Sequence, residues 1–161
     1  MSNETAADDR DPEEARKMVR ERYGAVATAG TDCCGDVGVD VDDGGCCDGN
    51  EGATGSERLG YETDDIASVA DGADLGLGCG NPKAFAEMAP GETVLDLGSG
   101  AGFDCFLAAR EVSPDGRVIG VDMTPEMVSK ARENVAKNDV DNVEFRLGEI
   151  SHLPVADATD R

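Results

Sequence analysis

One stretch of the chain decides the fold: Val94-Leu95-Asp96-Leu97-Gly98-Ser99-Gly100-Ala101-Gly102. Its apolar start predicts a buried strand, and its three alternating glycines predict a turn that leads into a helix. Glycines in such a turn adopt positive φ angles and let the backbone approach a ligand closely. The free N–H groups at the start of the helix point at that ligand. This stretch therefore predicts a nucleotide-type ligand held where a strand turns into a helix.

The residues that follow alternate between strand and helix patterns. Short apolar runs are separated by longer stretches with helical spacing, which is typical of βαβ units and a parallel sheet. The sequence therefore predicts an α/β fold. The expected elements are strands at 93–97, 117–121 and 142–147, a helix at 103–112, and a long helix that begins at Thr124 and Pro125.

An acidic residue, Asp122, stands at the end of the second expected strand, 20 residues after Gly102. A carboxylate at this place accepts hydrogen bonds from ribose hydroxyls in nucleotide-binding folds. The glycine spacing is Gly-x-Gly-x-Gly, not the Gly-x-Gly-x-x-Gly of dinucleotide-binding proteins. A turn whose glycines serve packing alone is the alternative. The order of strand, glycine turn, helix, strand and acid favours a bound cofactor.

The first 62 residues show a different pattern. Residues 1–10 are polar, and we expect a disordered tail. Residues 11–62 are expected to hold a helix, capped by Asp11 and begun by Pro12, and then a long loop rich in glycine and cysteine from Gly24 to Gly60. Helical spacing of apolar residues predicts one packed face on this helix, made of Ala15, Met18, Val19, Tyr23 and Val26.

The α/β domain is expected to begin at residue 63, so that residues 63–161 form its N-terminal part. A short helix over 63–70 is expected to come first, with Thr63 or Asp64 as its cap. A second short helix is expected from Pro82 to about Met88.

The charge balance excludes some classes of partner. The 161 residues include 14 Lys+Arg and 35 Asp+Glu, a formal net charge of −21. Nucleic acids and anionic membranes attract clustered basic residues, so we expect neither as a partner. A hydrated acidic surface predicts a protein adapted to high salt. The sequence has no long apolar run and no leader-like N-terminus, so we expect a cytoplasmic protein.

Six cysteines are the other compositional feature. Four form two adjacent pairs, Cys33-Cys34 and Cys46-Cys47, while Cys79 and Cys105 stand apart. Paired thiols in a reducing compartment indicate soft-metal, metalloid or redox chemistry. A zinc site is one alternative for the pairs, but their spacing lacks the Cys-x2-Cys pattern. Surface thiols without a role are the other alternative for at least two of these four cysteines. Cys105 is expected to pack in the core, and His152 to be structural or on the surface.

The glycine turn, the acid two residues before it and the acid after the next strand resemble the first motif of S-adenosylmethionine-dependent methyltransferases. The resemblance implies S-adenosylmethionine as cofactor and a Rossmann-like parallel sheet, with strand order 3-2-1-4-5-7-6, of which only the first three strands are readable here. It assigns to the cofactor Asp96 near the methionine moiety, Gly98, Ser99, Gly100 and Gly102 in the turn, Asp122 at the ribose, Met123 against the adenine, and Glu149 and Ile150 at the adenine's polar edge.

Three further elements narrow the resemblance to arsenite methyltransferases. They are Val19-Arg20-Glu21-Arg22-Tyr23-Gly24, the Cys-rich loop, and Gly76-Leu77-Gly78-Cys79-Gly80-Asn81-Pro82. The similarity runs from about Pro12 to Ala158 and implies methyl transfer to thiol-bound arsenic(III), held in line with the sulfonium methyl group. Thiolates suit a soft metalloid and leave its lone pair free, so alignment rather than a general base would accelerate the reaction.

The same resemblance suggests arsenic ligands and partners. Cys79 matches one arsenic ligand of the family and is the expected catalytic residue, while Cys33, Cys34, Cys46 or Cys47 is expected to supply another. The expected partners are arsenite as a thiol complex and a thiol reductant, such as thioredoxin or a glutathione-like thiol.

The family's further ligand, in an Asn-Cys-Val element beyond the third strand, has no counterpart in this sequence. We therefore expect a C-terminally truncated chain that keeps much of the cofactor site and lacks turnover on its own. Two other functions stay open. One is a related methyltransferase that acts on another small molecule, and the other is a non-catalytic, thiol-based module that binds metalloids.

Overall fold

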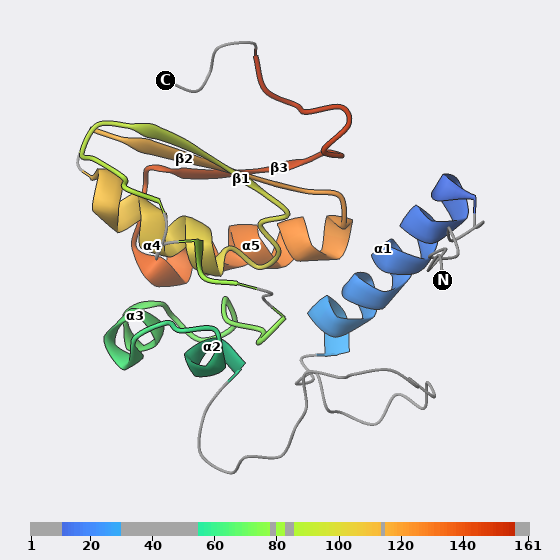
Figure 1. The fold of residues 1–161 in the computed structure, drawn as a ribbon, viewed down its shortest axis with the longest axis horizontal. Helices are drawn as coiled ribbons and strands as arrows, with labels where there is room; N and C mark the ends of the chain where they lie inside the picture. The colour runs from blue at the N-terminus through green and yellow to red at the C-terminus, as the bar shows by residue number, and fades with distance from the viewer. Residues whose placement is uncertain (1–10, 30–54, 78–79, 83–85, 114, 157–161) are drawn as a thin grey trace, which may run out of the picture.

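The structure is a computed structural model of the 161-residue chain, and it describes residues 11–29, 55–77, 80–82, 86–113 and 115–156. In Figure 1 the sheet lies above α4 and α5, with α2 and α3 beneath α4 and α1 at one side. Across these described ranges, no helix has the length and apolar character needed to span a bilayer.

Three parallel strands form the sheet, with β2 in the centre: β1 (Thr93–Leu97), β2 (Arg117–Asp122) and β3 (Val143–Leu147). The interior residues of β2 are all buried. Because the strands are parallel, their carboxyl ends lie at one edge of the sheet. The α/β prediction is confirmed, and the arrangement is an incomplete Rossmann-like fold whose order β1-β2-β3 matches the first three strands of the implied sheet.

Two crossover helices cover one face of the sheet: α4 (Phe103–Val112) follows β1, and α5 (Pro125–Asn138) follows β2 (Figure 1). The Phe106 ring of α4 meets the Phe145 ring of β3 edge to face, with ring centroids 5.7 Å apart. This contact lies directly behind the glycine turn and joins it to the centre of the core. The predicted bounds of β1 and α4 are confirmed, and those of β2 and β3 differ by one residue each.

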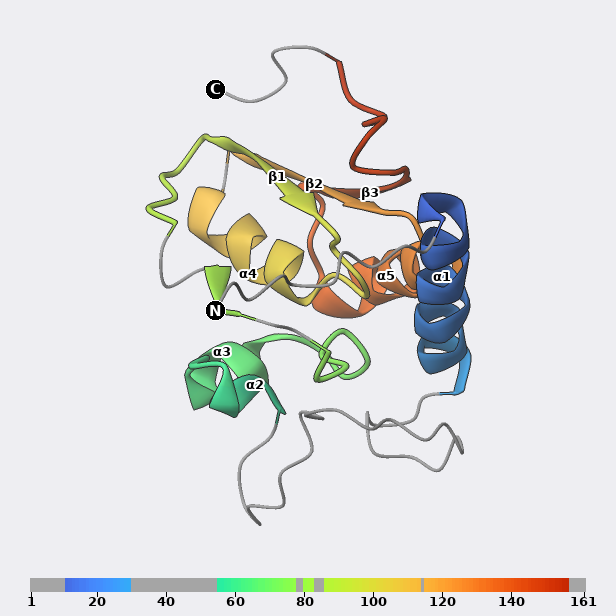
Figure 2. The same cartoon turned by 45° about the vertical axis from the view of Figure 1, so that its right-hand side comes forward.

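Helix α1 (Pro12–Ala29) begins where predicted, because Asp11 Oδ1 accepts a hydrogen bond from Glu13 N–H at 2.9 Å. The loop predicted from Gly24 is wrong at its start, since the helix continues through that residue. A Cβ at Gly24 would lie 3.1 Å from a carboxylate oxygen of Glu126 on α5. The missing side chain lets α1 pass close to α5 (Figure 2), and this packing outweighs the low helix propensity of glycine.

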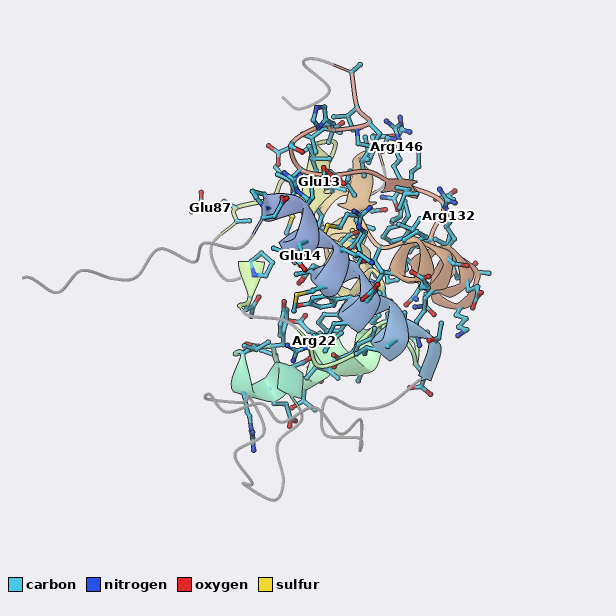
Figure 3. All side chains as sticks on the ribbon, turned by 90° about the vertical axis from the view of Figure 1, so that its right-hand side faces the viewer. Glu13, Glu14, Arg22, Glu87, Arg132 and Arg146 are labelled. Carbon is cyan, nitrogen blue, oxygen red and sulfur yellow. The ribbon has the colours of Figure 1, made fainter. Side chains whose placement is uncertain are left out.

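The apolar face predicted for α1 is only partly packed. Met18, Val19 and Tyr23 are 51%, 39% and 38% exposed, so the prediction is wrong for these three residues. The reason is that α1 contacts α5 near the C-terminal end of α1, where Lys130 Nζ of α5 donates a hydrogen bond to Ala27 O at 3.2 Å. Figure 3 looks onto α1, with Glu13 at its N-terminal end and Arg22 further along.

Two short helices precede the sheet, α2 (Gly55–Arg58) and α3 (Thr63–Ser68). The first falls inside the loop predicted up to Gly60, so that prediction is also wrong at its end. Ser56 Oγ donates to Asp74 Oδ1 at 2.7 Å and ties α2 to the segment that leads toward the sheet. The second confirms the short helix predicted over 63–70.

Of two local predictions around these helices, one is wrong and the other is wrong only at its end. The N-cap of α3 is Glu62, and its side chain makes no capping hydrogen bond. Thr63 and Asp64 are already inside the helix, so neither is the cap. Pro82 is in 3-10 helical conformation and its carbonyl accepts a hydrogen bond from Ala86 N–H at 2.9 Å, so the predicted helix start at Pro82 is confirmed. Residues 86–88 are not helical, so the predicted end at Met88 is wrong, while 83–85 lie outside the described residues. Pro90 follows closely and disfavours helical backbone in the residue before it.

Candidate cofactor site

A cavity of about 1050 Å³ opens at the carboxyl ends of the strands. Its walls come from α1, the segment between α2 and residue 82, the glycine turn, and the residues that follow β2 and β3. Ligands of open α/β sheets bind at this edge. The predicted cofactor residues that line the cavity are Asp96, Gly98, Ser99, Gly100, Asp122, Met123, Glu149 and Ile150.

The three glycines of the turn all have positive φ, with values of 86°, 50° and 97° at Gly98, Gly100 and Gly102. A Cβ added at Gly98 or Gly100 would meet nothing within 4 Å. Gly102 differs, because it does not line the cavity and a Cβ there would lie 2.5 Å from Phe145 Cζ. The first two glycines therefore leave room for a ligand. The third seats the turn on the core, in the sense that its lack of a side chain lets the turn pack directly against the Phe145 and Phe106 rings.

Asp122 is held at the end of β2 by two backbone N–H groups. Its Oδ2 accepts from Gly100 N–H at 3.0 Å, and its Oδ1 accepts from Thr124 N–H at 2.8 Å. Each carboxylate oxygen has two lone pairs, so both oxygens can accept further hydrogen bonds from ribose hydroxyls. The glycine turn and the start of α5 thus orient this carboxylate toward a ligand in the cavity.

Asp96 and Cys105 form a hydrogen-bonded pair at the base of the cavity, where the thiol Sγ lies 3.2 Å from Oδ2 of Asp96. Burial raises the pKa of Asp96, the thiol hydrogen bond opposes this rise, and the charge of Asp122 adds to it. Cys105 is completely buried, which confirms its predicted place in the core. Burial also raises the pKa of its thiol well above the ordinary value.

A second pair, Tyr61 and Asp104, lies beside the first. The Tyr61 hydroxyl donates to Asp104 Oδ1 at 2.5 Å. Burial raises the pKa of Asp104 to about 6; the hydrogen bond from Tyr61 lowers it, and the charges of Asp96 and Asp74 raise it. Burial raises the pKa of Tyr61 as well. The three neighbouring carboxylates Asp74, Asp96 and Asp104 make this wall of the cavity suited to a positively charged ligand.

We expect Asp104→Asn to change how stability depends on pH. The folded-state pKa of about 6 exceeds the ordinary value of 3.8, so the folded state binds this proton more tightly. The resulting stabilisation is complete below the ordinary value and is lost as pH rises through about 6. Asparagine cannot titrate, yet it still accepts from Tyr61. The free energy of unfolding of the variant should therefore rise, relative to wild type, between about pH 4 and pH 7.

Denaturant titrations at several pH values measure this difference, with the exposed Asp64→Asn as the matched control. The control is expected to follow the wild-type profile. Parallel profiles for Asp104→Asn and wild type would contradict the assignment of the raised pKa to Asp104.

Helix α1 contributes a wall of the cavity that sequence patterns did not predict. Val19 and Tyr23, which helical spacing placed in a packed face, line the cavity instead. Arg16 and Arg20 approach the Glu149 carboxylate at 4.0 and 3.8 Å. Such partly exposed ion pairs contribute about 1 kcal/mol or less each. These ion pairs connect α1 to the loop after β3, which contains the residues predicted at the polar edge of the adenine, Glu149 and Ile150.

The cysteines predicted as arsenic ligands, Cys33, Cys34, Cys46, Cys47 and Cys79, lie outside the described residues. The described residues nearest to Cys79 in the sequence, Leu77 and Gly80, belong to the cavity wall. His152 is exposed, as predicted. Within the part of the chain that the structure describes, no three His, Cys, Asp or Glu side chains gather to hold a metal ion.

Sequence comparisons agree with the geometry of this site. Residues 88–160 match the family model described as a methyltransferase domain. The chain is 81% identical over 156 residues to the arsenite methyltransferase of Halobacterium salinarum, a match that covers 96% of this chain and 40% of that protein. The resemblance to arsenite methyltransferases is thereby confirmed. The adaptation to high salt predicted from the acidic composition also fits a relative from Halobacterium salinarum.

Two further relatives match a shorter part of the chain. The arsenite methyltransferase of Aquipseudomonas alcaligenes is 38% identical over 87 residues, which cover 52% of this chain and 25% of that protein. A solved arsenic(III) S-adenosylmethionine methyltransferase from Chlamydomonas reinhardtii is 31% identical with a TM-score of 0.42, covering 61% of this chain and 32% of that one. The chain thus spans less than half the length of each of these relatives.

Proposed function

We propose that the protein transfers a methyl group from S-adenosylmethionine to thiol-bound arsenic(III). The observation that carries this proposal is the cavity in which the open backbone of Gly98 and Gly100 faces the oriented carboxylate of Asp122. The identity to the Halobacterium salinarum arsenite methyltransferase supports the choice of substrate.

The residues of the cavity fit this cofactor. Asp122 would accept hydrogen bonds from the ribose hydroxyls, and Asp96 would lie near the positively charged methionine moiety. Ser99 Oγ is buried without a hydrogen-bond partner among the described residues, so it offers a free polar atom to a ligand in the turn. Met123 would pack on the adenine, with Glu149 and Ile150 at its edge. Gly102 would seat the turn rather than touch the cofactor.

The substrate half of the proposal assigns arsenic to cysteine. When bound, S-adenosylmethionine supplies an electrophilic methyl group on a positive sulfonium. Cys79, with one of Cys33, Cys34, Cys46 and Cys47, would hold arsenic(III) through sulfur and leave its lone pair free to form the new bond to that methyl group. The protein's contribution is then alignment of the two partners. A thiol reductant of the thioredoxin or glutathione type would keep these cysteines reduced.

Calorimetric titration with arsenite tests the cysteine assignment. We expect Cys79→Ser to weaken arsenite binding at least tenfold, because an alcohol is a poor ligand for a soft metalloid. Affinity for S-adenosylmethionine should stay within about twofold of wild type, which shows that the variant is folded.

Equal arsenite affinity in wild type and Cys79→Ser would contradict the ligand role of Cys79. Binding of S-adenosylmethionine without any binding of arsenite would favour a methyltransferase for another small molecule. Binding of arsenite without S-adenosylmethionine would favour a metalloid-binding module.

A further inference from the structure

The hydrogen bond between Cys105 and Asp96 joins the core to the cavity wall. Cys105 is 0% exposed on the first turns of α4, and its Sγ lies 3.2 Å from Oδ2 of Asp96 in β1. An ionised carboxylate is an acceptor only, so the thiol donates its hydrogen. Asp96 itself lines the cavity. Cys105, which does not line the cavity, therefore holds one carboxylate oxygen of Asp96, which does.

The surroundings of Asp96 make this donor important. The charges of Asp104 and Asp122 lie close to it, the first from α4 and the second from the end of β2. The Tyr61 hydroxyl is also near, but it donates to Asp104 rather than to Asp96. Burial and the charge of Asp122 favour the neutral form of the Asp96 carboxyl. The hydrogen bond from Cys105 acts in the opposite direction.

We propose that Cys105 is a positioning residue for the cofactor, whose thiol fixes the Asp96 carboxylate so that its negative charge meets the positive end of S-adenosylmethionine. The inference rests on the proposed function of this cavity. Cys105 touches neither cofactor nor substrate and acts only through Asp96. Its place in the core is thus a requirement of the binding site as well as of packing.

Two substitutions separate these roles. Cys105→Ala removes the donor and a small volume, whereas Cys105→Ser keeps a donor, since a hydroxyl gives one hydrogen as a thiol does. Val112→Ala truncates another completely buried residue of α4 and serves as the control for a loosened core. A purely structural role would make Cys105→Ala behave like this control.

Carbon-13 NMR titration of the Asp96 carboxyl in the ligand-free protein is the first measurement. In Cys105→Ala the midpoint should move to higher pH, because the opposing hydrogen bond is gone. In Cys105→Ser it should return toward the wild-type value, and in Val112→Ala it should not move. An unchanged midpoint in Cys105→Ala would overturn the proposal, whatever the cofactor does.

Affinity for S-adenosylmethionine across pH is the second measurement. Cys105→Ala should bind about tenfold more weakly at the low end of the pH range, where more of its Asp96 is neutral, and the loss should shrink as pH rises. Cys105→Ser should restore most of the affinity. If wild type binds S-adenosylmethionine and Cys105→Ala binds it equally at every pH, this inference fails while the proposed function stands. If wild type does not bind it, the proposed function itself fails.

Discussion

Gly102→Ala is expected to lower the free energy of unfolding by about 2–5 kcal/mol, the sum of backbone strain and overpacking. Gly102 has a φ of 97°, and its new Cβ would lie 2.5 Å from Phe145 Cζ and 2.9 Å from Phe106 Cε2. Both rings belong to the packed core, so neither can move away freely. A loss of this size is a large part of the total stability of a small domain.

The same substitution at Gly98 is the matched control. Gly98 also has a positive φ, at 86°, but a Cβ there meets nothing within 4 Å. Gly98→Ala should therefore show only the backbone strain of about 1–2 kcal/mol. Chemical denaturation followed by circular dichroism, in a high-salt buffer that suits the acidic composition, measures both. Equal losses for the two variants would mean that Gly102 does not seat the turn on the core.

Asp122→Ala is expected to weaken binding of S-adenosylmethionine about 100-fold. A carboxylate that accepts two hydrogen bonds from a ligand contributes about 3 kcal/mol, which corresponds to this factor. The substitution also removes the acceptor of Gly100 N–H, so the turn loses the contact that orients it. Asp122→Asn should lose less affinity, because its amide oxygen still accepts a hydrogen bond.

Asp141→Ala provides the control for net charge, since it removes an exposed carboxylate away from the cavity. Its affinity should match wild type within about twofold. Titration calorimetry on the three variants measures the series. Asp122→Ala with wild-type affinity would show that the ribose contact is made elsewhere.

The central sheet was predictable because its signals are local. The short apolar run before Gly98, bounded by a glycine turn, has the pattern of a buried strand. The glycines after it can adopt the positive φ angles that the observed turn requires. Asp122 follows from the same logic, since its place is set by the next strand of a parallel sheet. This regular part of the chain also contains most of the predicted cofactor residues.

The rest of the site depends on contacts between segments far apart in sequence. The sequence pattern predicts a loop from Gly24, but this residue is helical, because α1 needs a residue without a side chain beside Glu126. Val19 and Tyr23 have the spacing of a packed face, and that spacing cannot tell a core from a cavity. The pairing of Tyr61 with Asp104 joins residues 43 positions apart, and no motif marks it.

Binding of S-adenosylmethionine to the wild-type chain, compared with NAD by calorimetry, tests the central claim most directly. The turn has Gly-x-Gly-x-Gly spacing, and the cavity presents a wall of carboxylates that suits a sulfonium and repels a pyrophosphate. We predict saturable binding of S-adenosylmethionine with one site per chain and no detectable binding of NAD. Binding of NAD alone, or of neither ligand, would contradict the assignment of this cavity to a methyltransferase cofactor.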